Sequence, residues 1–148
     1  MKKFILLISS VLVMASCHIT TPEEPVKENE KVYEAIGVLT ITSSGFTKED
    51  LRVKLVEKED ATMDLYMFDV KFAAAMPVTI DMLISGVKYT KFGNIISFFG
   101  DSIIPTAGGK PYEKYIIRDL EGEITKDSII LSNYYGTTPS IYRGAIKK

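Results

Sequence analysis

From Val32 onward, apolar and polar residues alternate along the chain with a period of two. In residues 51–60, Leu51, Val53 and Leu55 fall on one side and Arg52 and Lys54 on the other, which is typical of a strand with one buried face. Seven more ranges are rich in β-branched and aromatic residues and are bounded by turn residues: 32–45, 62–73, 78–89, 94–104, 112–125, 127–136 and 140–147. Eight short strands joined by short turns predict an all-β domain, either an up-and-down antiparallel barrel or a sandwich.

The alternation changes phase within residues 62–73. Met63 and Leu65 share one parity, whereas Phe68 and Val70 have the other. An extra residue in one strand turns the side chains that follow to the opposite face. The sequence therefore predicts a β-bulge or a sharp bend near Met67.

Strand parity also separates the inside of the predicted barrel from its outer wall. The residues assigned to the interior are Leu39, Ile41, Val53, Leu55, Ile80, Met82, Ile84, Leu120, Ile124 and Leu131. The opposite parity places Arg52, Lys54, Asp119, Glu121 and Glu123 on the solvent-exposed outer wall.

The first sixteen residues have the organisation of a secretory signal. Lys2 and Lys3 precede a short apolar run, and small residues follow it. The run is too short to cross a bilayer as a permanent helix. Residues 14–17, Met-Ala-Ser-Cys, resemble a bacterial lipobox, in which the cysteine is lipidated and becomes the first residue after cleavage. The sequence thus predicts a signal peptide over residues 1–16 and lipid attachment at Cys17, the only cysteine in the chain; an unmodified free thiol after a plain signal peptide is the alternative.

Residues 17–31 contain two prolines and many charges but few apolar residues, so they are expected to form a flexible tether. His18, the only histidine, lies in this range and is expected to lack fixed partners for catalysis. Removal of residues 1–16 takes two lysines from the 18 basic residues and none of the 19 acidic ones, leaving a net charge of −3. The composition does not favour a nucleic-acid partner, and the sequence contains no catalytic, nucleotide or cofactor motif.

Two groups of residues remain as candidate sites. Asp119, Glu121 and Glu123 alternate along one strand, and carboxylate oxygens suit calcium, although a solvated outer face explains the same pattern. Tyrosines near the strand ends are candidates for stacking on a sugar or lining the entrance of an apolar ligand at the barrel mouth, while packing across strands is the simpler explanation. These are Tyr112, Tyr115, Tyr134, Tyr135 and Tyr142.

Several short motifs resemble the calycin-like β-barrel lipoproteins of Gram-negative bacteria. They are Gly37-x-Leu39-x-Ile41, the stretches 67–89 and 120–131, and Tyr-Arg-Gly at 142–144, so that the resemblance spans nearly all of residues 35–148. The resemblance implies a lipocalin-like, eight-stranded antiparallel barrel over residues 32–148.

Two classes of function follow from this reading. The first is a non-enzymatic barrel, anchored by lipid to the outer membrane of the cell envelope, that binds a small apolar or glycan-like ligand or a partner protein. The second is a carboxylate-dependent hydrolase acting on cell-surface glycans. A polar interior cavity with carboxylates would favour the enzyme, and an apolar interior the binding protein.

The lipid anchor is directly testable. Metabolic labelling with a palmitate analogue is expected to mark the protein, and Cys17→Ala is expected to abolish the label and release the protein from membranes, since more than one acyl chain is needed for stable anchoring. Equal labelling of the variant would contradict the lipoprotein assignment.

Overall fold

The structure is a computed structural model that describes residues 18–148, so the predicted signal peptide and Cys17 lie outside the described residues. Strands dominate, as the alternating pattern predicts, and the single helical element within residues 18–148 is a 3₁₀ turn, η1 (Glu113–Tyr115). The strands are β1 (His18–Ile19), β2 (Val32–Ile41), β3 (Phe46–Glu57), β4 (Thr62–Val70), β5 (Thr79–Phe92), β6 (Ile95–Gly100), β7 (Thr106–Ala107), β8 (Lys110–Pro111), β9 (Ile117–Ile124), β10 (Ser128–Tyr135) and β11 (Thr138–Ile146).

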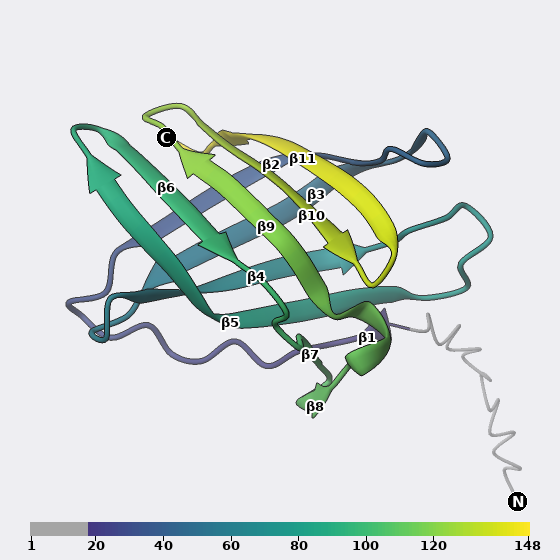
Figure 1. Cartoon of the computed structure of the whole chain (residues 1–148). Helices are drawn as coiled ribbons and strands as arrows, with labels where there is room; N and C mark the ends of the chain where they lie inside the picture. The colour runs from purple at the N-terminus through teal and green to yellow at the C-terminus, as the bar shows by residue number, and fades with distance from the viewer. Residues whose placement is uncertain (1–17) are drawn as a thin grey trace, which may run out of the picture.

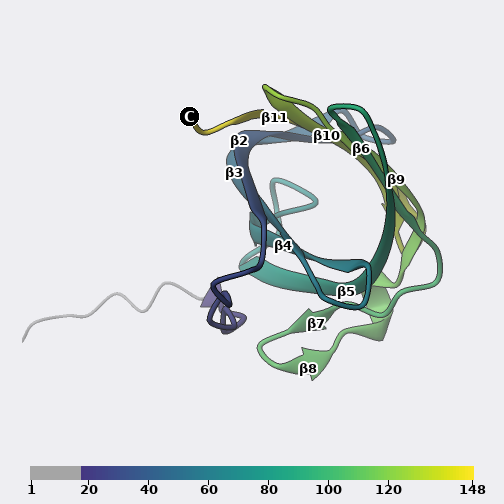
Figure 2. The same cartoon turned by 90° about the vertical axis from the view of Figure 1, so that its left-hand side faces the viewer.

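Eight of these strands close into an antiparallel barrel. The hydrogen-bonded order is β2-β3-β4-β5-β6-β9-β10-β11, and pairing of β11 with β2 closes the ring. Each ring strand pairs with the ring strand that follows it in the chain, and the last pairs with the first, so the barrel is of the up-and-down type. The closed ring is visible end-on in Figure 2, with β7 and β8 outside it. The fold class predicted from the sequence is confirmed.

Inward-facing apolar side chains fill the barrel. Each of the ten residues that parity assigns to the interior is no more than 2% exposed. Gly122 faces inward on β9, and a Cβ atom there would collide with the ring of Phe98 on β6. The glycine therefore lets an aromatic ring lie directly against the backbone of the neighbouring strand.

The phase change predicted near Met67 is confirmed. The register of β4 against β5 shifts between Met67 and Val70, and both residues are fully buried. Within this bulge Asp69 has a left-handed backbone, with φ of 56°. The bulge turns the Asp69 side chain outward, where it is largely exposed.

Residues 18–31 lie along the outside of the barrel and are not a free tether, at variance with the expectation from their composition. They run beneath β4 and β5 from one end of the barrel to the other (Figure 1). The two carboxylate oxygens of Glu23 pair with Arg52 at 2.9 Å and with Lys54 at 2.6 Å. Lys58 on the same wall pairs with Glu30 at 3.4 Å. Ion pairs hold this segment against the barrel, because it has too few apolar residues to be held by hydrophobic burial alone.

This segment changes the surroundings of two residues. Lys54 is on the outer side of β3, as parity predicts, but it is only 5% exposed because the segment covers it. The expectation of a solvated Lys54 is therefore wrong. The expectation that His18 lacks fixed partners is also wrong, because His18–Ile19 pairs in parallel with Thr79–Ile80 of β5.

The two faces of β9 provide a stability test with a matched control. Leu120→Ala is expected to reduce the free energy of unfolding by about 2–5 kcal/mol, because packing is lost and a void remains. Glu121→Ala, one residue away on the exposed face, is expected to change it by less than about 0.5 kcal/mol. Urea unfolding followed by circular dichroism measures both, and a greater loss in Glu121→Ala would contradict the inside-out assignment.

Candidate functional site

The candidate site lies on the outer wall built by β6, β9, β10 and β11. The pairing register places the outward side chains in rows: Phe99 of β6 lies beside Glu121 of β9, and Glu123 lies beside Ile130 of β10. Ile130 in turn lies beside Arg143 of β11. We call this surface the acidic wall, and its members are Phe99, Asp119, Glu121, Glu123, Ile130, Ile141 and Arg143.

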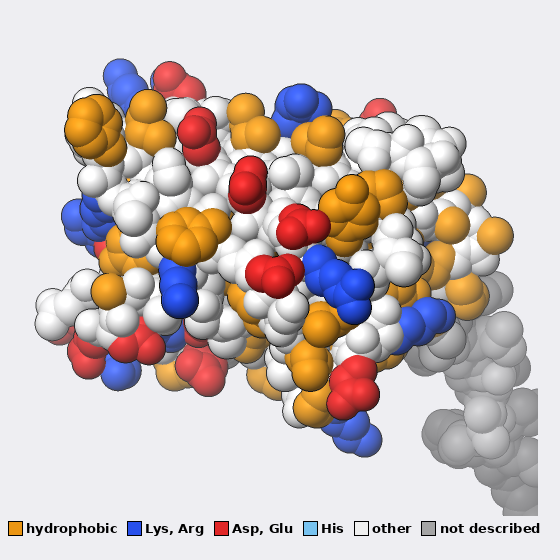
Figure 3. Space-filling view, viewed as in Figure 1, with side chains coloured by type: hydrophobic (Ala, Val, Ile, Leu, Met, Phe, Trp, Pro, Cys, Tyr) orange, Lys and Arg blue, Asp and Glu red, His pale blue; other side chains and the backbone are white. Residues whose placement is uncertain are grey.

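The acidic wall is hollowed. A groove of about 570 Å³ is lined by outward residues that include Phe99, Glu121, Ile130, Ile141 and Arg143. A second hollow of about 400 Å³ continues from it along β9 and β10. In Figure 3 acidic side chains follow β9 across this face, with hydrophobic side chains on both sides of them. The groove thus joins an apolar surface to a row of negative charge.

The three carboxylates of this wall, Asp119, Glu121 and Glu123, are exposed and make no ion pair within residues 18–148. The structure does not gather them into a metal site; the only metal-ligand cluster among the described residues is elsewhere. Glu121 and Glu123 lie two residues apart on the outer face of β9, so their carboxylates point outward side by side and cannot wrap one ion. Asp119 lies at a bulge, with φ of 47°, and is out of register with them.

Only part of the predicted aromatic mouth is present. Phe72, from the loop after β4, packs in tilted geometry against both Tyr115 and Tyr135, each at 4.6 Å between ring centroids. Tyr112 meets Tyr115 edge-on at 5.1 Å. These four rings close one end of the barrel. They pack against one another, so their faces are not free for a ligand.

The other two predicted mouth tyrosines lie elsewhere. Tyr142 is fully buried deep in the core, where its hydroxyl donates to the carbonyl oxygen of Leu51 at 3.2 Å. Tyr134 is 42% exposed on the outer wall. Tyr134 and Tyr135 are adjacent in the chain yet lie on opposite faces of β10, because successive residues of a strand face opposite sides.

A carboxylate that the sequence reasoning missed closes the opposite end of the barrel. Glu57 accepts a hydrogen bond from the Tyr33 hydroxyl at 2.6 Å and one from Tyr89 at 3.4 Å, and it pairs with Lys91 at 2.8 Å. Strand parity would have indicated this position, since Glu57 continues the inward-facing series of Val53 and Leu55 along β3. All its partners belong to the barrel, so Glu57 caps the end.

The surroundings of Glu57 affect ionisation at this end. Burial alone would raise the pKa of Glu57, but hydrogen bonds from Lys91 and Tyr33 and the Lys91 charge outweigh it and lower the pKa. Burial and the adjacent carboxylate raise the pKa of Tyr33. Glu57 is therefore held as a carboxylate bound to a neutral phenol.

No protein-family model matches the chain, and neither the curated proteins nor the solved structures contain a match. Among residues 18–148, no helix is long and apolar enough to span a membrane.

The ionised state of Glu57 predicts a pH dependence. Because folding lowers its pKa, Glu57 stabilises the protein above its ordinary value of 4.5, and this contribution is lost as the pH falls through the folded-state value. Glu57→Gln is expected to lower the urea midpoint near neutral pH and to make the midpoint fall less steeply in acid. Glu121→Gln, on the exposed wall, is the matched control and is expected to leave the urea midpoint near neutral pH unchanged. An unchanged slope in Glu57→Gln would contradict the capping role.

Proposed function

We propose that this protein is a non-enzymatic, calycin-like barrel, attached through a lipid on Cys17 to the outer membrane of the cell envelope, and that it binds a partner protein through the acidic wall. The observation that carries the proposal is the groove of about 570 Å³ on the outside of a barrel whose inside is filled. We further propose that the bound part of the partner is an extended, basic and partly apolar segment.

The filled interior favours a surface partner over an internal ligand. Eight-stranded barrels have room either for side chains or for one small ligand, and here buried side chains from all eight ring strands form one cluster. The Phe72 and Glu57 groups close the two ends. A ligand entering this barrel would have to displace packed side chains, and each apolar side chain exposed to water would lose its free energy of burial.

The opposite wall shows how this barrel holds a segment. There Arg52 and Lys54 both form ion pairs with the Glu23 carboxylate. The Arg52 guanidinium also lies 3.7 Å from the centroid of the Phe68 ring. A second apolar cluster of Val56, Tyr66 and Phe68 lies beneath. Charge pairs over an apolar patch thus bind an acidic segment, and the acidic wall likewise places charged side chains, there mostly carboxylates, beside apolar ones.

The acidic wall favours a basic segment for the same physical reason. Glu121 and Glu123 would pair with Lys or Arg side chains, while Phe99 and Ile130 would cover apolar ones. Complementary charge orients such an encounter and raises its rate. The carboxylates stand side by side on an open wall instead of facing each other across a cleft, and this arrangement does not favour the glycosidase-type alternative.

Site-specific photocrosslinking in cells tests the proposal. A benzophenone amino acid at Phe99, inside the groove, is expected to give a discrete protein adduct that Glu121→Lys with Glu123→Lys removes. The control is the same amino acid at Phe92, which is 89% exposed at the tip of the β5–β6 hairpin. Greater exposure alone would make Phe92 the better crosslinker, whereas specific binding makes it the poorer one.

Two outcomes would contradict the proposal. One is an adduct at Phe92 equal to that at Phe99, which indicates collision and not binding. The other is co-purification of a small apolar molecule, detected by native mass spectrometry, that is lost when an interior residue such as Leu131 is enlarged to Phe. That result would place the ligand inside the barrel.

A further inference from the structure

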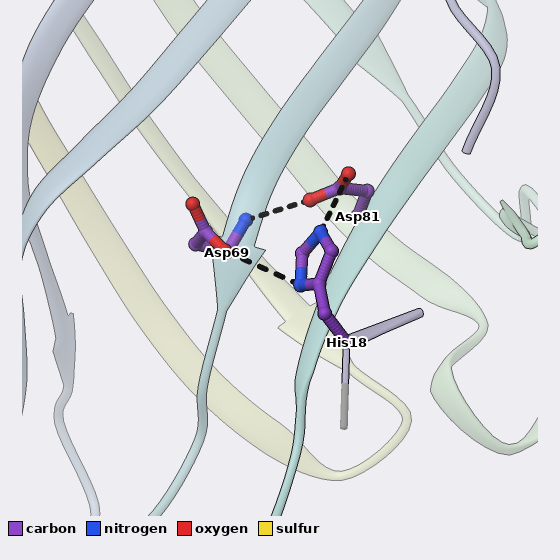
Figure 4. Close-up of side chains that lie close together, drawn as sticks. All are labelled: His18, Asp69 and Asp81. Carbon is purple, nitrogen blue, oxygen red and sulfur yellow. Dashed lines mark hydrogen bonds and ion pairs between the residues drawn. The ribbon is translucent and has the colours of Figure 1, made fainter. Parts of the chain in front are cut away.

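The N-terminal segment begins fastened to the barrel wall. His18 lies between two aspartates (Figure 4). Its Nε2 atom is 3.1 Å from Oδ2 of Asp81, and its Nδ1 atom is 3.3 Å from Oδ1 of Asp69. The Thr79 hydroxyl oxygen lies 2.7 Å from the same Nδ1 atom, and β1 pairs in parallel with β5. The first described residue is therefore held through both its backbone and its side chain.

This attachment leaves no spacer between the barrel and a lipid on Cys17. Cys17 is bonded directly to His18, and consecutive Cα atoms are about 3.8 Å apart. As a free tether, residues 18–31 would allow the barrel to stand up to about 50 Å from the membrane. Because His18 is fastened to β5, a lipid anchor instead brings this end of the barrel to the membrane surface.

An exposed apolar loop lies at the same end of the barrel. Residues 71–78 leave the end of β4 and return to the start of β5, where β1 is paired (Figure 1). Ala73, Ala74, Ala75 and Pro77 are exposed, and Met76 is partly buried. Consecutive exposed apolar residues of this kind are unusual on a protein surface that meets only water. The loop is therefore a candidate for contact with an apolar partner.

The base of this loop is fixed, so that only its middle projects. Phe72 is 8% exposed and packs against the rings of Tyr115 and Tyr135. The Met76 N–H donates to the carbonyl oxygen of Ala73 at 3.2 Å and closes a turn, and β5 begins shortly after it at Thr79. A fixed base holds the apolar residues of the turn away from the barrel.

We propose that residues 73–77 and β1 form a membrane-contact face that lies on the surface of the lipid bilayer. This inference depends on the lipid anchor of the proposed function and adds the face that meets the membrane. Apolar side chains of the loop would enter the boundary between headgroups and acyl chains. Lys71 and Lys114 adjoin the base of the loop, and Glu113 supplies one opposing charge, so the balance suits anionic headgroups.

The same orientation keeps the acidic wall free. In the ring order, β4 and β5 lie across the barrel from β10 and β11, as the end-on view of Figure 2 shows. Membrane contact at the start of β5 therefore does not cover the groove on the opposite wall. The bilayer and the partner would meet different faces of the barrel.

Fluorescence quenching in vesicles tests this orientation. The protein is purified in its lipidated form, in which the sulfur of Cys17, the only native cysteine, carries the lipid and does not react with a label. Ala74→Cys places a label on the loop, and Asn94→Cys, in the exposed turn after β5, is the matched control. The 14 residues of β5 separate the two positions by roughly 40 Å. Each labelled protein is added to vesicles of phosphatidylethanolamine and phosphatidylglycerol in which some headgroups carry a nitroxide quencher.

Quenching is expected to be several-fold stronger for the label at position 74 than for the label at position 94. Ala73→Glu with Ala75→Glu, added to the Ala74→Cys chain, is expected to remove most of this quenching while the protein still floats with the vesicles, because charged side chains oppose entry into the interface. Failure to float would contradict the lipid anchor itself, and this proposal with it. In protein that floats, equal quenching at the two positions, or quenching that the two glutamates leave unchanged, would overturn the membrane-contact face alone.

Discussion

Closure of the barrel by the pairing of β2 with β11 is the interaction on which the rest of the structure depends. These strands are the first and last of the ring, and seven consecutive residue pairs join them, from Ser140–Ile41 to Ile146–Ala35. Gly37 and Gly144 meet across this junction, and a Cβ atom on Gly37 would collide with the backbone of Arg143. The chain has a single cysteine, so hydrogen bonds and packing alone keep the ring closed and remove the free strand edges that favour aggregation.

Closure also determines which surface is left for the proposed partner. Once the ring is formed, every strand must send alternate side chains inward, and in a barrel of eight strands those side chains fill the available space. Phe72 with its tyrosine neighbours and Glu57 with its hydrogen-bond partners close the two ends. The surface left for the proposed partner is the outer wall, which is basic around Arg52 and Lys54 and acidic along β9.

Polar contacts hold the N-terminal segment, residues 18–31, against the outside of the barrel. Its acidic side chains neutralise the basic wall, and its first described residue enters the group formed with Asp69 and Asp81. Thr21 extends the attachment, because its hydroxyl donates to the carbonyl oxygen of Asp81 at 2.6 Å and accepts from the N–H of Gly108 at 3.2 Å. A segment that has little to bury is thus held mainly by polar contacts, which the composition does not reveal.

The sequence by itself determined the strands, their inward and outward faces and the bulge after Met67. These are local consequences of a period of two and of turn residues, and the all-β barrel follows from them. Only the tertiary structure decided that Tyr142 lies in the core, that Glu57 caps an end, that Lys54 is covered and that His18 faces Asp69 and Asp81. Those features depend on which strands become neighbours and on how the chain ends pack. His18 and Asp81 are 63 residues apart in the chain, and their contact depends on the parallel pairing of β1 with β5, which no local pattern reveals.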